Sequence, residues 1–123
     1  MNFLEQHSEL FPDDLSKDEA ILLTAEQINK DFGAEVITIV NNHVELQQLL
    51  DGVRMYIATI PYRNAEKLVQ LLYRVDLKEN TVREILQHPN PESILEDLTN
   101  EVIRRELLKV LMRRYFSRTN TND

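Results

Sequence analysis

The sequence predicts an all-α protein, a bundle of about five helices in a single domain, residues 1–123, with a long C-terminal helix. Only two glycines and four prolines occur, which is too few for the many tight turns of a β-sandwich or β-barrel. Apolar residues recur at helical spacing along most of the chain. A length of 123 residues is enough for one hydrophobic core, so one helical domain is the simplest arrangement.

The first strongly marked helix begins at Ser16. Ser16 and Glu19 form a capping box, in which the serine hydroxyl accepts from the Glu19 amide and the Glu19 side chain reaches back. Gly33 suits the left-handed residue that ends such a helix. Residues 1–15 are expected to be a weakly structured segment with a short helix ended by Pro12. The apolar face of the main helix consists of Ile21, Ala25, Ile28 and Phe32.

Residues 35–40 have two interpretations. Their β-branched side chains favour a short strand, and residues 53–60 would be the best partner strand in an α+β alternative. For the apolar residues after this segment, a helical period nevertheless places more of them on one face than the two-residue period of a strand does. We therefore expect a helix from about residue 43 to Thr59. Its apolar stripe comprises Leu46, Leu49, Leu50, Val53, Ile57 and Ile60.

Two shorter helices are predicted after Pro61, which interrupts the chain. Asn64 can cap the first of them, and Asp76 can cap the second. The expected inward residues of the first are Ala65, Leu68, Leu72 and Val75, and those of the second are Val82, Ile85 and Leu86.

The final helix has the clearest start signal in the chain. Asn90 is a favourable N-cap, and Pro91 suits the first helical position. We expect this helix to run from about Glu92 to Ser117, followed by a polar tail at 118–123. Its predicted apolar face comprises Ile94, Leu95, Leu98, Val102, Leu108, Leu111 and Tyr115.

Charge is unevenly distributed along the chain, whose net charge is −7. Residues 1–51 contain 11 acidic and 2 basic residues, whereas residues 104–118 contain 6 basic residues and one acidic residue. The overall acidity disfavours non-specific nucleic-acid binding, but a local basic stripe does not. The six basic residues of the final helix form a candidate interaction surface: Arg104, Arg105, Lys109, Arg113, Arg114 and Arg118.

This basic stripe has three interpretations: a solvated face that packs against acidic helices, a nucleic-acid site, or a protein-contact surface. Local pairing is available to Arg104 and Arg105 because Glu101 lies three and four residues before them. Arg113, Arg114 and Arg118 follow the last acidic residue of the helix and have no evident local partner.

Residues 73–76 form a second candidate, a polar corner between two helices. Asp76 would cap the later helix there, and Arg74 could pair with Asp76, Glu96 or Asp97. Tyr73 could hydrogen-bond across the same corner. The corner is interpreted as a polar latch between two helices, with a ligand-contacting Arg–Tyr pair as the alternative.

The sequence contains no catalytic, cofactor-binding or metal-binding pattern. It has no cysteine, which excludes disulfides and thiolate sites, and its three histidines are scattered without metal-ligand spacing. Two glycines cannot build a phosphate-binding loop. No apolar run approaches the roughly 18 residues of a membrane span, and the acidic N-terminus is unlike a signal peptide. We therefore expect no enzyme activity, no cofactor, no membrane partner and a cytoplasmic location.

Two segments carry a family resemblance: LLYRVDLKE at 71–79 and EVIRRELLKVLMRRYF at 101–116. They resemble a family of small uncharacterised bacterial helical proteins with an LLYR-hydrophobic-D-x-x-E corner and a basic C-terminal helix. The resemblance covers the C-terminal half, from Leu46 onward. It implies a helical fold and a cytoplasmic bacterial setting, and it implies no reaction.

Missing catalytic chemistry and segregated charge together favour a non-enzymatic regulatory or adaptor protein that acts through protein–protein contacts, as a homo-oligomer. One alternative is a nucleic-acid-associated factor that uses the basic C-terminal helix. Another is a small acidic immunity or antitoxin-like inhibitor. An enzyme that uses Tyr73, Arg74 and Asp76 is the last alternative.

Overall fold

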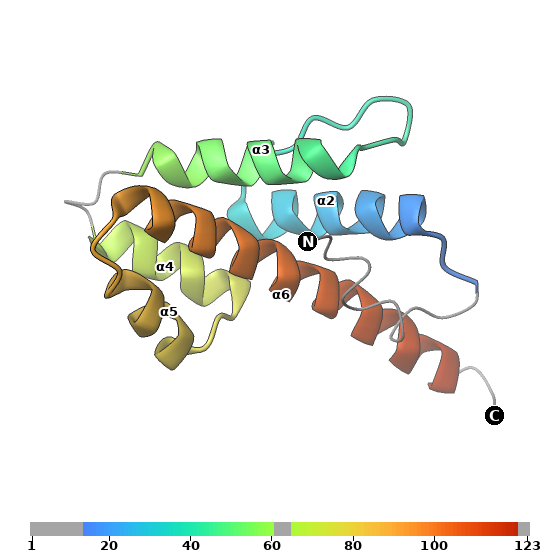
Figure 1. The fold of residues 1–123 in the computed structure, drawn as a ribbon. Coiled ribbons are helices and arrows are strands. Elements are labelled where there is room, and N and C mark those ends of the chain that lie inside the picture. Colours follow the sequence, from blue (N-terminus) through green and yellow to red (C-terminus); the bar gives the residue numbers. More distant parts are fainter. Residues whose placement is uncertain (1–13, 61–64, 121–123) are drawn as a thin grey trace.

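The computed structural model describes residues 14–60 and 65–120, and within them it contains five helices and no β-strand (Figure 1). The predicted all-α fold is confirmed. The α+β alternative is wrong for the described residues, because 53–58 belong to a helix and 35–40 form a loop. The helices are α2 (Lys17–Phe32), α3 (Leu46–Ala58), α4 (Ala65–Val75), α5 (Glu79–Leu86) and α6 (Pro91–Asn120).

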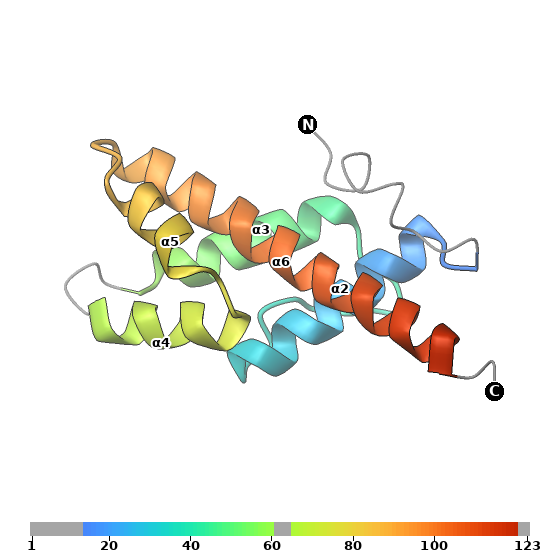
Figure 2. The same ribbon diagram turned by 90° about the horizontal axis from the view of Figure 1, so that it is seen from below.

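The long helix α6 organises the bundle, because it packs against each of the other four described helices. Its most extensive contacts are with α2 and α3, and Figure 2 shows it crossing both of them. Helices α4 and α5 lie beside the N-terminal half of α6 (Figures 1 and 2). The most deeply buried side chains of the core include Ala20, Ala25, Ile28, Val53, Val75 and Val102.

Helix α2 begins and ends as the sequence predicts. The Ser16 hydroxyl accepts a hydrogen bond from the Glu19 amide at 3.1 Å, and Gly33 ends the helix with φ 65°. Glycine is favoured there because it has no Cβ to oppose the left-handed conformation. The second half of the predicted capping box is wrong, since the Glu19 carboxylate contacts Arg114 on α6 instead.

The loop between α2 and α3 is held by side chains rather than by a sheet. Asn29 on α2 donates to the carbonyl of Ile37 and accepts from its amide, both at 2.9 Å, and the Ile37 side chain is buried. Asn41 and Asn42 both have positive φ, 53° and 56°, and form the tight turn that joins Val40 to residue 43. Asparagine tolerates this conformation because its side chain is short and polar. The helix that follows starts at Leu46, later than expected.

The corner between α4 and α5 differs from the prediction. Asp76 has φ 69° and closes α4: its amide donates to the Tyr73 carbonyl, and the next amide, of Leu77, donates to Leu72. This bonding pattern is that of a helix C-terminus. Asp76 therefore does not cap α5, whose N-cap is Lys78. The predicted break at Pro61 and cap at Asn64, like the predicted helix before Pro12, lie outside the described residues.

The start of α6 is confirmed, but its predicted apolar face is partly wrong. The Asn90 side chain accepts from the Glu92 amide at 2.9 Å, and Pro91 is the first helical residue. Leu108 is only partly buried and Tyr115 is 63% exposed, although both were expected in the core. The helix also continues through Asn120, so residues 118–120 are helical rather than tail. The buried described positions of its C-terminal half are Glu106, Leu107, Val110 and Leu111.

Candidate functional site

Three polar contacts join α2 to the C-terminal half of α6. Arg114 contacts the Glu19 carboxylate at 3.0 Å, and Arg113 donates to the Gln27 side-chain oxygen at 2.8 Å. One turn earlier on α6, Lys109 contacts Asp31 at 2.9 Å. The two arginines thus have partners far away in sequence, which local reasoning could not supply. The side chain of Arg118 lies outside the described residues.

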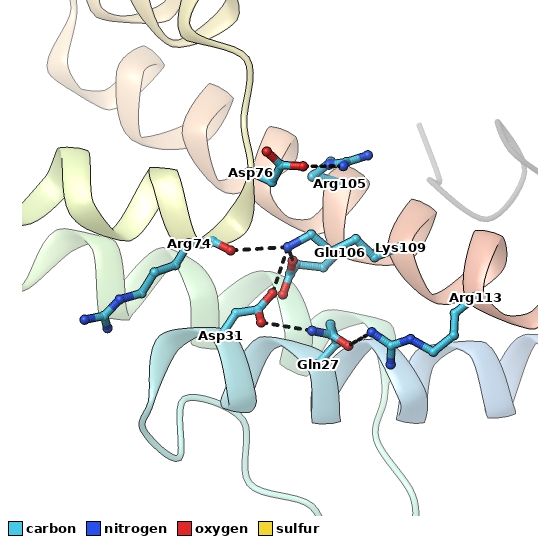
Figure 3. Close-up of polar contacts among 8 residues, drawn as sticks. All are labelled: Gln27, Asp31, Arg74, Asp76, Arg105, Glu106, Lys109 and Arg113. Carbon is cyan, nitrogen blue, oxygen red and sulfur yellow. Dashed lines mark hydrogen bonds and ion pairs between the residues drawn. The ribbon is translucent and has the colours of Figure 1, made fainter.

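The innermost of these contacts belongs to a buried triad of Asp31, Glu106 and Lys109 (Figure 3). The Glu106 side chain is completely buried, and those of Asp31 and Lys109 are 15% and 18% exposed. The Lys109 ammonium lies 2.9 Å from an Asp31 oxygen and 3.0 Å from a Glu106 oxygen. It also approaches the carbonyl of Arg74 at 3.4 Å. The triad therefore joins α2, the end of α4 and α6.

Burial controls the protonation of Glu106. It raises the pKa of this carboxyl to about 8, although the Lys109 ammonium acts in the opposite direction. Apart from the Lys109 ammonium, 3.0 Å from one oxygen, no donor within the described chain reaches the Glu106 carboxyl group, so an ionised Glu106 would be poorly solvated. The protonated acid can instead donate to Asp31. Glu106 is therefore a neutral acid at neutral pH.

Asp31 has the opposite shift. Burial by itself would raise its pKa, but hydrogen bonds from Lys109, Glu106 and Gln27 outweigh burial and lower it below the ordinary value. Asp31 is thus the carboxylate that balances the Lys109 charge. The triad as a whole is close to neutral at neutral pH, which is the condition under which buried charges are tolerated.

The three residues of the predicted polar corner do not act together. Asp76 contacts Arg105 on α6 at 2.7 Å, so a latch exists, but its basic partner is not Arg74. Tyr73 is 83% exposed, and its side chain makes no hydrogen bond across the corner to a described residue. The Arg74 side chain extends away from the triad in Figure 3, and no described carboxylate pairs with it. Glu96, one of the partners predicted for Arg74, lies 3.8 Å from Arg54 instead.

The other predicted cations are also engaged. Arg104 contacts Glu101 at 3.1 Å, as its sequence spacing suggested. Arg105 bypasses Glu101 and contacts Asp76. Each of the five candidate cations whose side chains are described therefore lies against a carboxylate or amide of the same chain: Arg104, Arg105, Lys109, Arg113 and Arg114.

An apolar surface remains at the C-terminal end of α6, which we call the α6 patch: Met112, Tyr115 and Phe116. Their side chains are 50%, 63% and 55% exposed, and they lie three and four residues apart, on one face of the helix. The two rings meet edge to face with centroids 5.7 Å apart. Together with Leu111 they line a shallow hollow of about 260 Å³.

Sequence reasoning missed the triad because the core-facing stripes were assigned from apolar residues alone, and Asp31 and Glu106 were given no role. One signal was available: Glu106 lies four residues after Val102 and four before Val110, on the stripe that faces the core. A charged residue at such a position requires a buried partner. The partner Asp31 is far away in the sequence, so its identity needed the fold.

The described residues contain no group of three or more histidine or carboxylate side chains that could hold a metal ion. Within the described chain, no helix combines the length and apolarity that a membrane span requires. Comparison with known proteins found no matching family, no matching curated protein and no matching solved structure.

Proposed function

We propose that this protein is a non-enzymatic adaptor that works through protein–protein contact, and that a second copy of the chain is the partner of the α6 patch. The observation that carries the proposal is the exposure of Met112, Tyr115 and Phe116 on one helical face. Methionine and aromatic side chains are enriched in protein interfaces, and contiguous exposed apolar side chains mark interaction sites.

The cations about two turns before the patch on α6 are already paired within the chain. The guanidinium of Arg105 is balanced by Asp76, and that of Arg104 by Glu101. These two cations would therefore add little like-charge repulsion if two copies meet through their α6 patches. A two-fold pairing also places the same apolar surface on both sides, which is the usual form of a homodimer interface.

A nucleic-acid-associated role has less support. Lys109 and Arg114 are engaged with carboxylates of α2, and Arg113 is engaged with Gln27. A nucleic acid makes many phosphate contacts at once and would have to compete with most of these pairs, whereas a protein partner at the α6 patch would leave them in place.

The test is the molar mass of the purified protein by light scattering over a range of concentrations. We expect a dimer whose dissociation constant rises about 30-fold in Met112→Lys, because a central interface side chain contributes on the order of 2 kcal/mol. Met55→Lys is the matched control, since Met55 is 70% exposed on α3, and it should leave the dimer unchanged.

A photo-crosslinking amino acid at position 112 gives a second measurement inside cells. A cross-link between two copies of the chain supports the proposal. A cross-link to a different protein would show that the second copy is the wrong partner. A monomer at every concentration with no cross-link would overturn the proposed function altogether.

A further inference from the structure

A groove of about 390 Å³ runs between α2 and α6, on a different face of α6 from the α6 patch. Each helix contributes residues with helical spacing, Leu23 to Lys30 on α2 and Val110 to Ser117 on α6. Leu23 and Val110 give the groove an apolar component. The volume lies within the range of small-molecule sites, about 300–1,000 Å³.

The charged side chains of the groove are predominantly cationic. Lys30, Arg113 and Arg114 line it, against a single carboxylate, Glu26. An anion in the groove would therefore meet net positive charge. The neighbouring apolar side chains lower the local dielectric constant and strengthen that attraction.

The two arginines are held in position with donors to spare. Gln27 accepts from Arg113 and donates to Asp31 at 2.9 Å, so the Arg113 side chain is fixed by a chain of hydrogen bonds that begins at the buried triad (Figure 3). Arg114 uses one terminal nitrogen to contact Glu19. Its Nε is buried and has no hydrogen-bond partner within the described chain. A guanidinium has five N–H donors, so both arginines can still bind an anion.

We infer that this groove binds a small amphiphilic anion, with a carboxylate or phosphate head group at Arg113 and Arg114 and a short apolar body against Leu23 and Val110. The head group supplies acceptors to fixed guanidinium donors, and the body removes apolar surface from water. The inference is independent of the proposed dimer, because the groove and the α6 patch share no residue.

Titration calorimetry of the full chain with four probes tests this inference: octanoate, octyl phosphate, octanol and inorganic phosphate. We expect saturable binding of octanoate or octyl phosphate, and the tighter of the two identifies the head group. Octanol lacks the charge and inorganic phosphate lacks the apolar body, so each should bind at least about tenfold more weakly. Equal binding of octanol, or no saturable binding of either charged amphiphile, would overturn the inference.

The variant Arg113→Gln/Arg114→Gln locates the site. It should weaken binding of the charged amphiphile by at least about tenfold, while Arg54→Gln, a matched change on α3, should have no effect. Unchanged affinity in the double variant would contradict the assignment. If the double variant does not fold, amide NMR of the unmodified protein decides: shifts must be largest within the two groove segments, 23–30 and 110–117, and largest shifts elsewhere would refute the site.

Discussion

The substitution Glu106→Gln keeps the shape of the protonated acid and removes its ability to ionise. In the unfolded chain this carboxyl has the ordinary pKa of 4.5, whereas in the folded protein its pKa is about 8. Below pH 4.5 both states hold the proton, so the stabilising contribution of the buried acid is fully present. As pH rises from there to about 8, the unfolded state ionises first, and the wild-type protein loses stability.

The size of this loss follows from the two pKa values. They differ by about 3.5, and each pH unit corresponds to about 1.4 kcal/mol, so the loss is at most about 5 kcal/mol by pH 8. At pH 7 it is about 3 kcal/mol by the same reasoning. Water that enters around an ionised Glu106 would reduce both values. Glu106→Gln should therefore be more stable than wild type at neutral pH, by an amount that shrinks as the solution is acidified.

Urea unfolding followed by circular dichroism, from about pH 5 to about pH 8, measures this difference. The hydrogen bond with Glu45 raises the pKa of His43, but this group is common to both proteins and its contribution cancels in the comparison. Glu96→Gln is the control, since Glu96 is an exposed residue of the same helix and should leave the pH dependence unchanged. Parallel pH profiles for wild type and Glu106→Gln would refute the buried neutral acid.

Two predictions concern the loop before α3. In Gly52→Ala the new Cβ would lie 2.5 Å from Ile37 Cδ1 and 3.0 Å from the Val36 carbonyl oxygen. We therefore expect the free energy of unfolding to fall by about 1–3 kcal/mol. An unchanged urea midpoint would contradict this. Asn29→Ala removes both hydrogen bonds to Ile37 and should cost about 2 kcal/mol, with faster hydrogen exchange at the Ile37 amide. Unchanged exchange would mean that the loop is held by other contacts.

Local signals in the sequence predicted both ends of α2 and the start of α6. Ser16, Gly33 and Asn90 act through atoms within a few residues of themselves, so their side chains and conformations could be assigned without a fold. Asp76 shows the limit of such reasoning. An aspartate can cap the start of one helix or occupy the left-handed position that ends another, and here the contact with Arg105 is available to it in the second role.

The core stripe of α6 was predicted from its apolar residues alone, so Glu106 had no place in it. The predicted stripe included Leu108, which is only partly buried, and Tyr115, which is exposed. The true stripe includes a carboxyl group that is tolerated in the core because it is protonated and lies against the Lys109–Asp31 ion pair. Asp31 is on α2, whereas Glu106 and Lys109 are on α6. The arrangement can therefore be recognised only when the packing of the two helices is known.

The positive charge of α6 therefore contributes first to the fold. A phosphate that drew Lys109 out of the triad would leave Asp31 beside Glu106 without a counter-ion, and one that drew Arg114 away would release Glu19. In each case the free energy gained from the phosphate contact would be partly offset by the loss of an ion pair within the protein. Burying Met112 against a partner removes apolar surface from water and breaks none of these contacts. This difference makes the α6 patch, rather than the basic residues beside it, the stronger candidate for a contact with another protein.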